Sequence, residues 1–262
     1  KKILRSGKVN YWTEKENKKF EKNFQNYFKI RHAIAISNGT AGLYLAVKAL
    51  NLKKNSEIIV SPRSYYASAS CIFLNECVPK FVDIDLNTQN ICINNLRKSI
   101  SKKTKAIICV HLNGYPCDMK EIIKIAKQYN LYVIEDCSQA HGAQINNKFV
   151  GSFGDISVWS FCQDKIISTS GEGGMIATNN KKFYKNIWSQ KDQGRNINKV
   201  NQKKGNKFKY IHDYLGFNFR MTEIQAKIGI IQLSNLKRWV NKRNHNAQLI
   251  INLLRKYPEI FD

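Results

Sequence analysis

The sequence predicts an α/β fold built on an open, mostly parallel sheet of about seven strands. Short apolar runs alternate along most of the chain with segments in which apolar residues recur at helical spacing, the pattern of parallel strands joined by crossover helices. Several apolar runs end in polar or acidic residues, as expected at the carboxyl edge of such a sheet. The chain has 262 residues, 43% of them hydrophobic, which is enough to form one large core.

The first strand is expected at residues 33–36 (AIAI), because this apolar run leads directly into a turn sequence, SNG. A helix begins at residues 38–40, since apolar side chains then recur at helical spacing as far as Leu50. The second strand is expected at residues 57–60 and ends before Pro62, because proline cannot donate to a sheet ladder.

Helical spacing resumes after the second strand and continues to about Asn75, which predicts another crossover helix. Apolar runs at residues 80–84 and 105–110 predict the third and fourth strands. Asp118 is a typical N-terminal cap, so a helix is expected from Asp118 to Tyr129.

The remaining strands are expected at residues 131–136, 156–161 and 174–178. Only a polar loop and a glycine-rich turn separate the last two, so we expect them to pair antiparallel. A long helical pattern then begins at Thr222 and continues to about Leu254.

The cysteine content indicates a reducing compartment. There are seven cysteines, an odd number with no C-x-x-C pair, and most lie in apolar stretches. This favours buried free thiols over a disulfide framework or a zinc site. No apolar run is long enough to span a bilayer, and the amino terminus lacks the apolar stretch of a secretory signal. We therefore expect a cytoplasmic protein with no membrane span and no metal site.

The formal net charge is +24, but the lysines are spread along the whole chain. The densest patch, residues 199–209, is also rich in Asn and Gly and is typical of a solvated loop. No helix-turn-helix, zinc-finger or RNA-binding strand pattern is present. We therefore expect no nucleic-acid partner, although the charge can attract an anionic ligand.

Two polar clusters follow predicted strands, where parallel sheets bind ligands. Residues 37–40 (SNGT) end the first strand and begin a helix, where free N–H groups and the helix dipole favour an anion and Gly39 allows close approach. Asp136 closes the fifth strand, with Gln139 and His141 just beyond it. An ordinary capped turn and a helix cap remain the alternative interpretations of these clusters.

Two further clusters lie later in the chain. Lys165 follows the sixth strand, in residues 160–165 (SFCQDK), and leads to a glycine turn at residues 171–174 (GEGG). A lysine between two buried strands is poorly solvated, which makes its amine a nucleophile for carbonyl groups; otherwise a lone lysine in so basic a chain is a surface residue. Residues 216–221 (GFNFRM) place a polar pair between aromatic residues just before the long helix.

Together these segments resemble the DegT/DnrJ/EryC1/StrS family of sugar aminotransferases, which are pyridoxal-phosphate-dependent enzymes of fold type I. The resemblance covers residues 3 to about 254, almost the whole chain. Its most specific stretches are residues 37–41 (SNGTA), 81–85 (FVDID), 133–142 (VIEDCSQAHG), 150–155 (VGSFGD) and the Lys165 loop with its GEGG turn. Several such blocks in the same order argue against a chance match.

The resemblance implies a three-layer α/β/α large domain, which binds pyridoxal phosphate, at residues 1–235. Residues 236–262 would then form the long-helix connection toward a small C-terminal domain. Chains of the family usually continue through that domain, so we expect it to be missing here and the chain to be a fragment or an excised domain.

The resemblance also implies pyridoxal 5'-phosphate as the cofactor and Lys165 and Asp136 as catalytic residues. Lys165 would bind the cofactor's aldehyde covalently and then carry a proton between the substrate carbon and the cofactor. Asp136 would face the pyridine nitrogen and keep it protonated, which makes the ring an electron sink. Gln139 would contact the phenolic oxygen of the ring.

Other residues would hold the rest of the cofactor. The phosphate would be bound by Gly39, Thr40 and Ser160. Asn218 matches an asparagine that in relatives reaches the phosphate from the neighbouring subunit, which implies a homodimer with shared active sites. An aromatic residue after the proline of the second strand stacks on the ring in relatives; Tyr66 is the best match, and Tyr65 is the alternative.

The resemblance implies transfer of an amino group from glutamate to a keto-sugar, nucleotide-linked in most relatives, in amino-sugar biosynthesis for surface polysaccharides. Transamination of a small phosphorylated ketone is one alternative. A pyridoxal-phosphate-dependent sugar dehydratase is another, but dehydratases of the family replace the lysine with histidine, so Lys165 argues against it. A non-catalytic basic binding protein is the last alternative, and a colourless protein would support it.

Three remaining polar residues have simpler interpretations. His141 is interpreted as a packing or hydrogen-bonding neighbour of the site. Asp83 and Asp85 could be taken for a metal pair, but they follow a strand with no other ligands nearby and are interpreted as turn formers.

Overall fold

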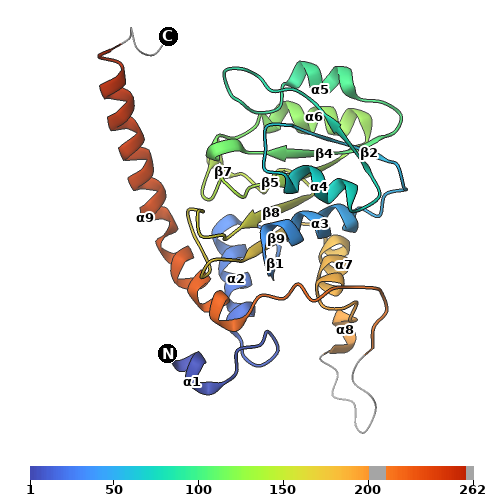
Figure 1. Cartoon of the computed structure of the whole chain (residues 1–262), viewed down its shortest axis with the longest axis vertical. Coiled ribbons are helices and arrows are strands. Elements are labelled where there is room, and N and C mark those ends of the chain that lie inside the picture. Colours follow the sequence, from blue (N-terminus) through green and yellow to red (C-terminus); the bar gives the residue numbers. More distant parts are fainter. Residues whose placement is uncertain (201–210, 258–262) are drawn as a thin grey trace.

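The computed structural model describes residues 1–200 and 211–257 and has a seven-stranded sheet at its centre (Figure 1). The strands are β1 (His32–Ile36), β2 (Glu57–Val60), β3 (Val78–Phe81), β4 (Thr104–Val110), β5 (Tyr132–Asp136), β8 (Ile156–Ser160) and β9 (Gly174–Thr178). The predicted α/β class and the number of strands in the sheet are confirmed. Most of the lysine-rich patch at residues 199–209 lies outside the described residues.

The sheet has the order β1-β9-β8-β5-β4-β2-β3. Every neighbouring pair from β8 to β3 is parallel, whereas β9 is antiparallel to both β8 and β1. The predicted antiparallel pairing of the last two strands is therefore confirmed. Its cause is the short connection at residues 161–173, which holds no crossover helix of the kind that a parallel pair needs.

The third strand was predicted at residues 80–84, and this position is wrong. β3 begins at Val78 and ends at Phe81, where it pairs with β2 along one edge only. The chain leaves the sheet early because Asp83 and Asp85 direct turns: Asp83 Oδ1 accepts from the Ile84 N–H at 2.8 Å. Asp85 Oδ1 accepts from two following backbone N–H groups at 3.1 and 2.9 Å. The prediction that these aspartates form turns is thus confirmed.

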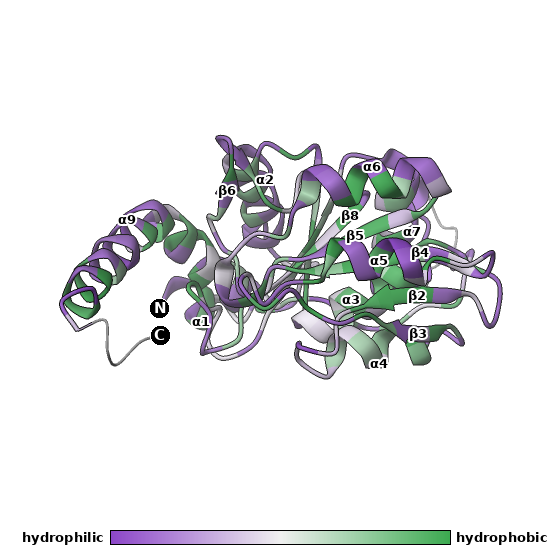
Figure 2. Cartoon of the chain, turned by 90° about the horizontal axis from the view of Figure 1, so that it is seen from above, coloured by the Kyte–Doolittle hydropathy of each residue, from purple (hydrophilic) through white to green (hydrophobic). Residues whose placement is uncertain are grey.

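Helices cover both faces of the sheet. They are α1 (Lys2–Ser6), α2 (Glu16–Phe28), α3 (Gly39–Ala49), α4 (Ala67–Phe73), α5 (Ile93–Ser99), α6 (Met119–Tyr129), α7 (Lys181–Lys191), α8 (Ile197–Val200) and α9 (Glu223–Leu254). Figure 2 shows α3 and α4 on one side of the sheet and α2 and α6 on the other. One core cluster joins α3, α4 and α7 to the sheet, and two others join α2 with α9 and α5 with α6 to the opposite face. The expected three-layer architecture is present.

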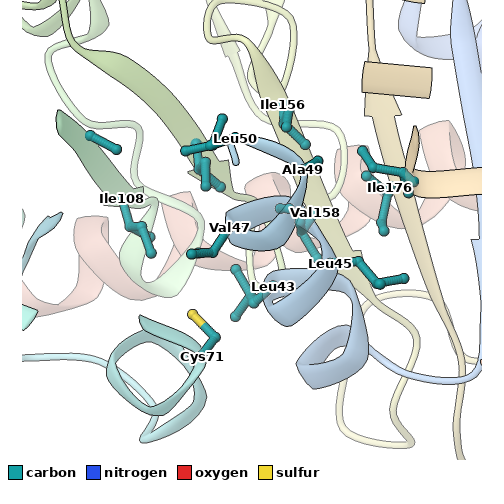
Figure 3. Close-up of a cluster of buried hydrophobic side chains, with 14 of the residues drawn as sticks. Leu43, Leu45, Val47, Ala49, Leu50, Cys71, Ile108, Ile156, Val158 and Ile176 are labelled. Carbon is teal, nitrogen blue, oxygen red and sulfur yellow. The ribbon is translucent and has the colours of Figure 1, made fainter. Parts of the chain in front are cut away.

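The central helix α3 connects the strands to the site. Its apolar face packs on side chains from β4, β8 and β9, including Ile108, Val158 and Ile176 (Figure 3). A Cβ atom at Gly42 would lie 2.7 Å from Val158 Cγ1, so glycine allows α3 to approach the sheet closely. This contact fixes the start of α3 beside the carboxyl ends of the neighbouring strands.

Helix α9 is continuous from Glu223 to Leu254 and projects away from the rest of the chain (Figure 1). It begins with a capping box formed by Thr222 and Gln225, and its first turns pack against α2. The last buried residue of α9 is Leu236. The expected boundary between residues 235 and 236 therefore falls inside one helix, close to where burial ends, and the two-part organisation stays a prediction. No helix within residues 1–200 and 211–257 is long and apolar enough to cross a membrane.

Candidate active site

The start of α3 forms an anion-binding geometry beside Ser160. The Asn38 side chain caps α3 by accepting a hydrogen bond from the Ala41 N–H at 2.8 Å. The backbone N–H groups of Gly39 and Thr40 lie in the first turn and therefore have no acceptor within the helix. A Cβ atom at Gly39 would lie only 2.8 Å from Ser160 Cβ, so the structure brings these predicted phosphate ligands together.

Asp136 lies at the end of β5, is 5% exposed and is held by two hydrogen bonds. Its Oδ1 accepts from the Ser138 N–H at 3.1 Å, and its Oδ2 accepts from the Ser68 hydroxyl at 3.0 Å. Ser68 Oγ also lies 2.8 Å from Ser64 Oγ. Asp136 was predicted from the sequence, whereas Ser64 and Ser68 were not.

Gln139 is half-buried just after Asp136 and has one end of its amide occupied. Its Oε1 accepts from the Asn113 N–H at 2.6 Å. This bond orients the side chain and leaves the amide nitrogen as the group that can donate to a ligand oxygen. The predicted contact with a phenolic oxygen needs such a donor.

Lys165 lies in the loop between β8 and β9 with its side chain 18% exposed. The side chain is therefore only partly shielded from solvent, and its charge is compensated, because Lys165 Nζ lies 2.8 Å from the carboxylate of Asp164. That hydrogen bond lowers the pKa of Asp164, which is itself exposed. Backbone bonds such as Phe161 N–H to Gly173 O, at 2.8 Å, tie the two ends of the loop together.

Lys165, Gln139 and His141 line one cavity of about 1120 Å³ beside α9. His141 is 1% exposed and packs against Phe161, with ring centroids 5.8 Å apart. Burial lowers the pKa of His141 to about 3, with the Lys165 charge acting in the same direction and the Ser160 backbone opposing it. Within the described residues neither ring nitrogen reaches a partner with hydrogen-bond geometry. The structure therefore agrees with a packing role for His141.

The remaining predicted residues lie on exposed surface. Tyr65 and Tyr66 are 74% and 79% exposed, so either ring is available for stacking and the choice between them stays open. Asn218 is also exposed and forms an isolated bridge with Asp192. The neighbouring Phe219 carbonyl accepts from the Ser37 N–H at 2.9 Å, which attaches the Asn218 segment to the end of β1.

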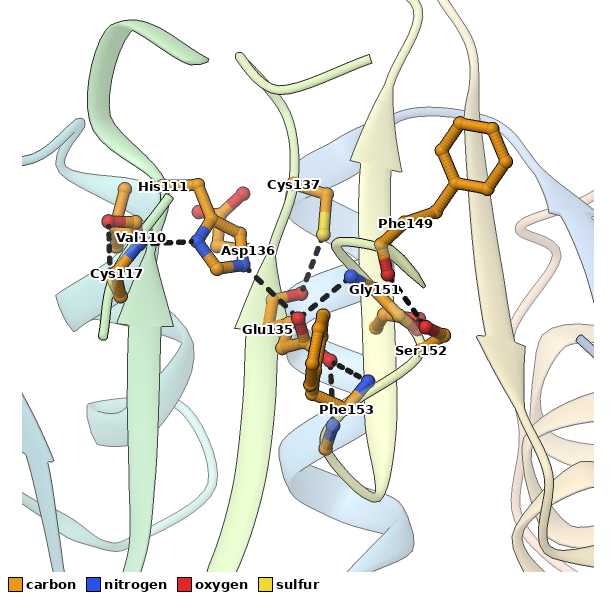
Figure 4. A network of polar contacts seen from close by, with 12 residues as sticks. Val110, His111, Cys117, Glu135, Asp136, Cys137, Phe149, Gly151, Ser152 and Phe153 are labelled. Carbon is orange, nitrogen blue, oxygen red and sulfur yellow. Dashed lines mark hydrogen bonds and ion pairs between the residues drawn. The ribbon is translucent and has the colours of Figure 1, made fainter. Parts of the chain in front are cut away.

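A buried network below Asp136 joins His111, Glu135 and the loop before β8 (Figure 4). The Cys117 N–H donates to His111 Nδ1 at 3.1 Å, so the ring proton is on Nε2 and faces Glu135 Oε2, also at 3.1 Å. The Glu135 carboxylate accepts three more bonds, from the N–H groups of Gly151, Phe153 and Gly154. Although these side chains and Cys137 are close enough for a metal, their acceptor atoms are already used, so we interpret the network as structural.

The model of the DegT/DnrJ/EryC1/StrS aminotransferase family matches residues 1–262. The chain belongs to this family. Within the family it is 41% identical over 244 residues to GDP-perosamine synthase of Escherichia coli O157:H7, covering 93% of this chain and 63% of that one. It is also 41% identical to GDP-perosamine synthase of Caulobacter vibrioides, covering 83% of this chain and 56% of that one.

Solved structures of aminotransferases and related enzymes share the fold. The X-ray structure of the aminotransferase from Psychrobacter cryohalolentis has a TM-score of 0.96 and 43% identity, covering 98% of this chain and 66% of that one. An E. coli GDP-4-keto-6-deoxy-D-mannose-3-dehydratase with bound hydrated PLP has a TM-score of 0.89 and 31% identity, covering 98% and 69%. The chain spans less than two thirds of the length of the GDP-perosamine synthases that it matches.

Proposed function

We propose that this chain is the cofactor-binding part of a pyridoxal-phosphate-dependent aminotransferase that moves an amino group from glutamate to a nucleotide-linked keto-sugar. The observation that carries the proposal is the set of groups at one edge of the sheet. The first turn of α3 offers N–H groups that have no acceptor within the helix, β5 ends in a buried carboxylate and β8 leads into the Lys165 loop. Each group is complementary to a different part of the cofactor.

The chemistry of the donor set fits pyridoxal 5'-phosphate. When bound, the cofactor supplies an electron-withdrawing ring next to the reacting carbon of the substrate. The dianionic phosphate suits the N–H groups of Gly39 and Thr40, backed by the Ser160 hydroxyl. The Asp136 carboxylate suits the protonated pyridine nitrogen, and the Gln139 amide suits the phenolic oxygen.

Lys165 has two tasks in this proposal. It would hold the cofactor through Nζ and, as a free amine, would take up and return the proton that leaves the substrate carbon. Both tasks need a free amine, so the ion pair with Asp164 has to open when the cofactor binds. Asp164 is 64% exposed, which allows its carboxylate to turn to solvent at little cost.

The remaining assignments concern the partner subunit and the ring face. We infer a cytoplasmic homodimer in which Asn218 completes the phosphate site of the neighbouring subunit, and the exposure of Asn218 supports this. Tyr66 stacks on the ring, with Tyr65 as the alternative; both rings are free to do so.

The names of relatives support a nucleotide-linked substrate. They include the GDP-perosamine synthases, a dTDP-3-amino-3,6-dideoxy-alpha-D-galactopyranose transaminase of Aneurinibacillus thermoaerophilus and a UDP-N-acetyl-3-dehydro-alpha-D-glucosamine 3-aminotransferase of Acidithiobacillus ferrooxidans. Their nucleotides differ, so the class of substrate is proposed here and not the base. A small phosphorylated ketone remains the second candidate, since the basic surface also suits it.

In the test, the protein produced from its own gene is incubated with glutamate. A panel of GDP-, dTDP- and UDP-linked keto-sugars and small keto-phosphates is supplied as acceptors, one at a time. We expect 2-oxoglutarate to form in equal amount with an amino sugar when one nucleotide-linked sugar is present. An unaminated deoxy product would indicate the dehydratase instead. Absence of 2-oxoglutarate with every acceptor would contradict the proposal.

A further inference from the structure

Two serine hydroxyls form a chain that ends on the Asp136 carboxylate. Ser68 Oγ lies 3.0 Å from Asp136 Oδ2, and Ser64 Oγ lies 2.8 Å from Ser68 Oγ. Ser68 is 1% exposed and Asp136 is 5% exposed. Solvent therefore cannot readily replace the bond between them.

The direction of donation follows from the chemistry of the groups. An ionised carboxylate can only accept, so the Ser68 hydroxyl donates its single proton to Asp136. Ser68 Oγ is then available only as an acceptor toward Ser64, whose hydroxyl must be the donor. Each bond polarises the next one, so Ser64 strengthens the bond that Ser68 makes to the carboxylate.

The second oxygen of Asp136 is held by a different part of the chain. Oδ1 accepts from the Ser138 N–H at 3.1 Å, in the backbone that continues from β5, whereas Ser68 comes from α4. A carboxylate otherwise rotates easily about its terminal bond, which has broad, roughly two-fold preferences. Two donors on different elements remove that freedom and leave one orientation of the carboxylate plane.

We propose that Ser68, supported by Ser64, is a positioning residue that orients the Asp136 carboxylate toward the pyridine nitrogen of the bound cofactor. The inference rests on the proposed function, because it assumes that Asp136 faces the ring. Ser68 acts through Asp136 alone. Its loss would let the carboxylate turn, so that a positive charge on the ring nitrogen would be less well stabilised and Lys165 Nζ, when bonded to the cofactor, would become more basic.

The experiment uses the cofactor-loaded protein and compares Ser68→Ala, Ser68→Thr and Ser64→Ala with the wild type. The first readout is the pH titration of the visible absorption band of the bound cofactor, and the second is cofactor affinity. For Ser68→Ala we expect the midpoint to rise by about half a pH unit or more, with roughly three- to tenfold weaker cofactor binding. Ser68→Thr keeps the hydroxyl and should restore the wild-type midpoint, and Ser64→Ala should give a smaller shift in the same direction.

Ser70→Ala is the matched control, because Ser70 lies in the same helix and makes no bond to Asp136. Equal midpoints for Ser68→Ala, Ser70→Ala and wild type would overturn the inference while leaving the proposed function intact. If the wild type itself bound no cofactor, the proposed function would fail instead. If Ser68→Ala did not fold, Ser64→Ala would decide: a rise in the midpoint supports the inference, and an unchanged midpoint overturns it.

Discussion

The Lys165 side chain is 18% exposed and its Nζ lies 2.8 Å from the carboxylate of Asp164. These surroundings follow from the loop, whose ends are joined by backbone hydrogen bonds between β8 and β9. The proposed function assigns the covalent bond to the cofactor to this amine. The assignment of Lys165 can therefore be tested by the visible absorption of the cofactor-loaded protein as well as by its activity.

Lys165→Ala should bind the cofactor only non-covalently and lose the visible absorption band of the covalent form. Catalysis should fall by at least about a thousandfold, because both the covalent link and the proton carrier are lost. Absorption spectra of the wild type and variant, titrated with cofactor, provide the measurement. Lys237→Ala is the control, since it removes a lysine from the α9 wall of the same cavity. An identical visible band in Lys165→Ala would show that another lysine binds the cofactor.

His141 gives a prediction about stability and pH. Burial holds the pKa of His141 at about 3, whereas in the unfolded chain it is near 6.5. Below about pH 6.5 the unfolded chain binds a proton that the folded protein does not, so the free energy of unfolding falls as the pH falls. Between pH 7 and pH 5 this residue should cost about 2 kcal/mol of stability.

Urea unfolding of the wild type and His141→Leu at the two pH values measures that effect. Leucine has a similar volume and no titrating group, so the variant should lose less stability on acidification by about the same 2 kcal/mol. Other groups titrate equally in both proteins and cancel in the comparison. Equal losses for the two proteins would mean that His141 is protonated in the folded state.

The residues that the sequence could identify are those whose role depends on a local pattern. Asp136 ends an apolar strand and Gly39 follows one, so each is visible in its own segment. Ser68 cannot be identified in this way, because its role depends on a hydrogen bond to Asp136, 68 positions away in the sequence. A hydroxyl in a short helix can make many kinds of hydrogen bond, and only the folded structure shows that this one reaches the end of β5.

Among the elements, the buried strands were predictable, including the edge strand β1, whereas the exposed edge strand β3 was not. Strands β4, β5, β8 and β9 are buried on both faces and appear in the sequence as apolar runs. β3 is an edge strand with exposed residues, so its apolar run does not mark its ends. Helix α2 was not predicted at all, although Phe20, Phe24 and Phe28 recur at helical spacing and are buried.

The junction of α3 with β8 provides a prediction for an element. Gly39→Ala would place a methyl group 2.8 Å from Ser160 Cβ, so the start of α3 has to move away from β8. The N–H groups of the first turn move with it, and we expect cofactor affinity to fall by about tenfold or more. Equilibrium binding of pyridoxal 5'-phosphate to the folded variant measures the effect.

Gly42→Ala separates this effect from general destabilisation. Its methyl group would meet Ile36 and Val158 at 2.7 Å, three residues further along α3, where the backbone N–H already donates to the Asn38 carbonyl. It should lower the free energy of unfolding but leave the affinity of the folded fraction nearly unchanged. Equal losses of affinity in both variants would contradict a specific role for the start of α3.

At the scale of the whole molecule, the three layers bring the predicted cofactor ligands to one sheet edge with one exception. Asn218 lies on exposed surface, between the end of α7 and the end of β1. A buried ion pair between Asp192 and Arg220 anchors the same segment. This attachment of an exposed asparagine is consistent with presentation to another subunit.

Subunit mixing tests that arrangement. Lys165→Ala and Asn218→Ala should each be inactive as homodimers, because one lacks the amine and the other lacks a phosphate ligand from across the interface. When the two variants are mixed under exchange conditions, half of the dimers combine one subunit of each kind, and each of these has one site with both residues intact. We therefore expect recovery of about a quarter of the wild-type activity, measured as 2-oxoglutarate formation. If Asn218 instead acts within its own subunit, no mixed dimer contains an intact site and the mixture stays inactive, because each chain then lacks one of the two residues that its own site requires.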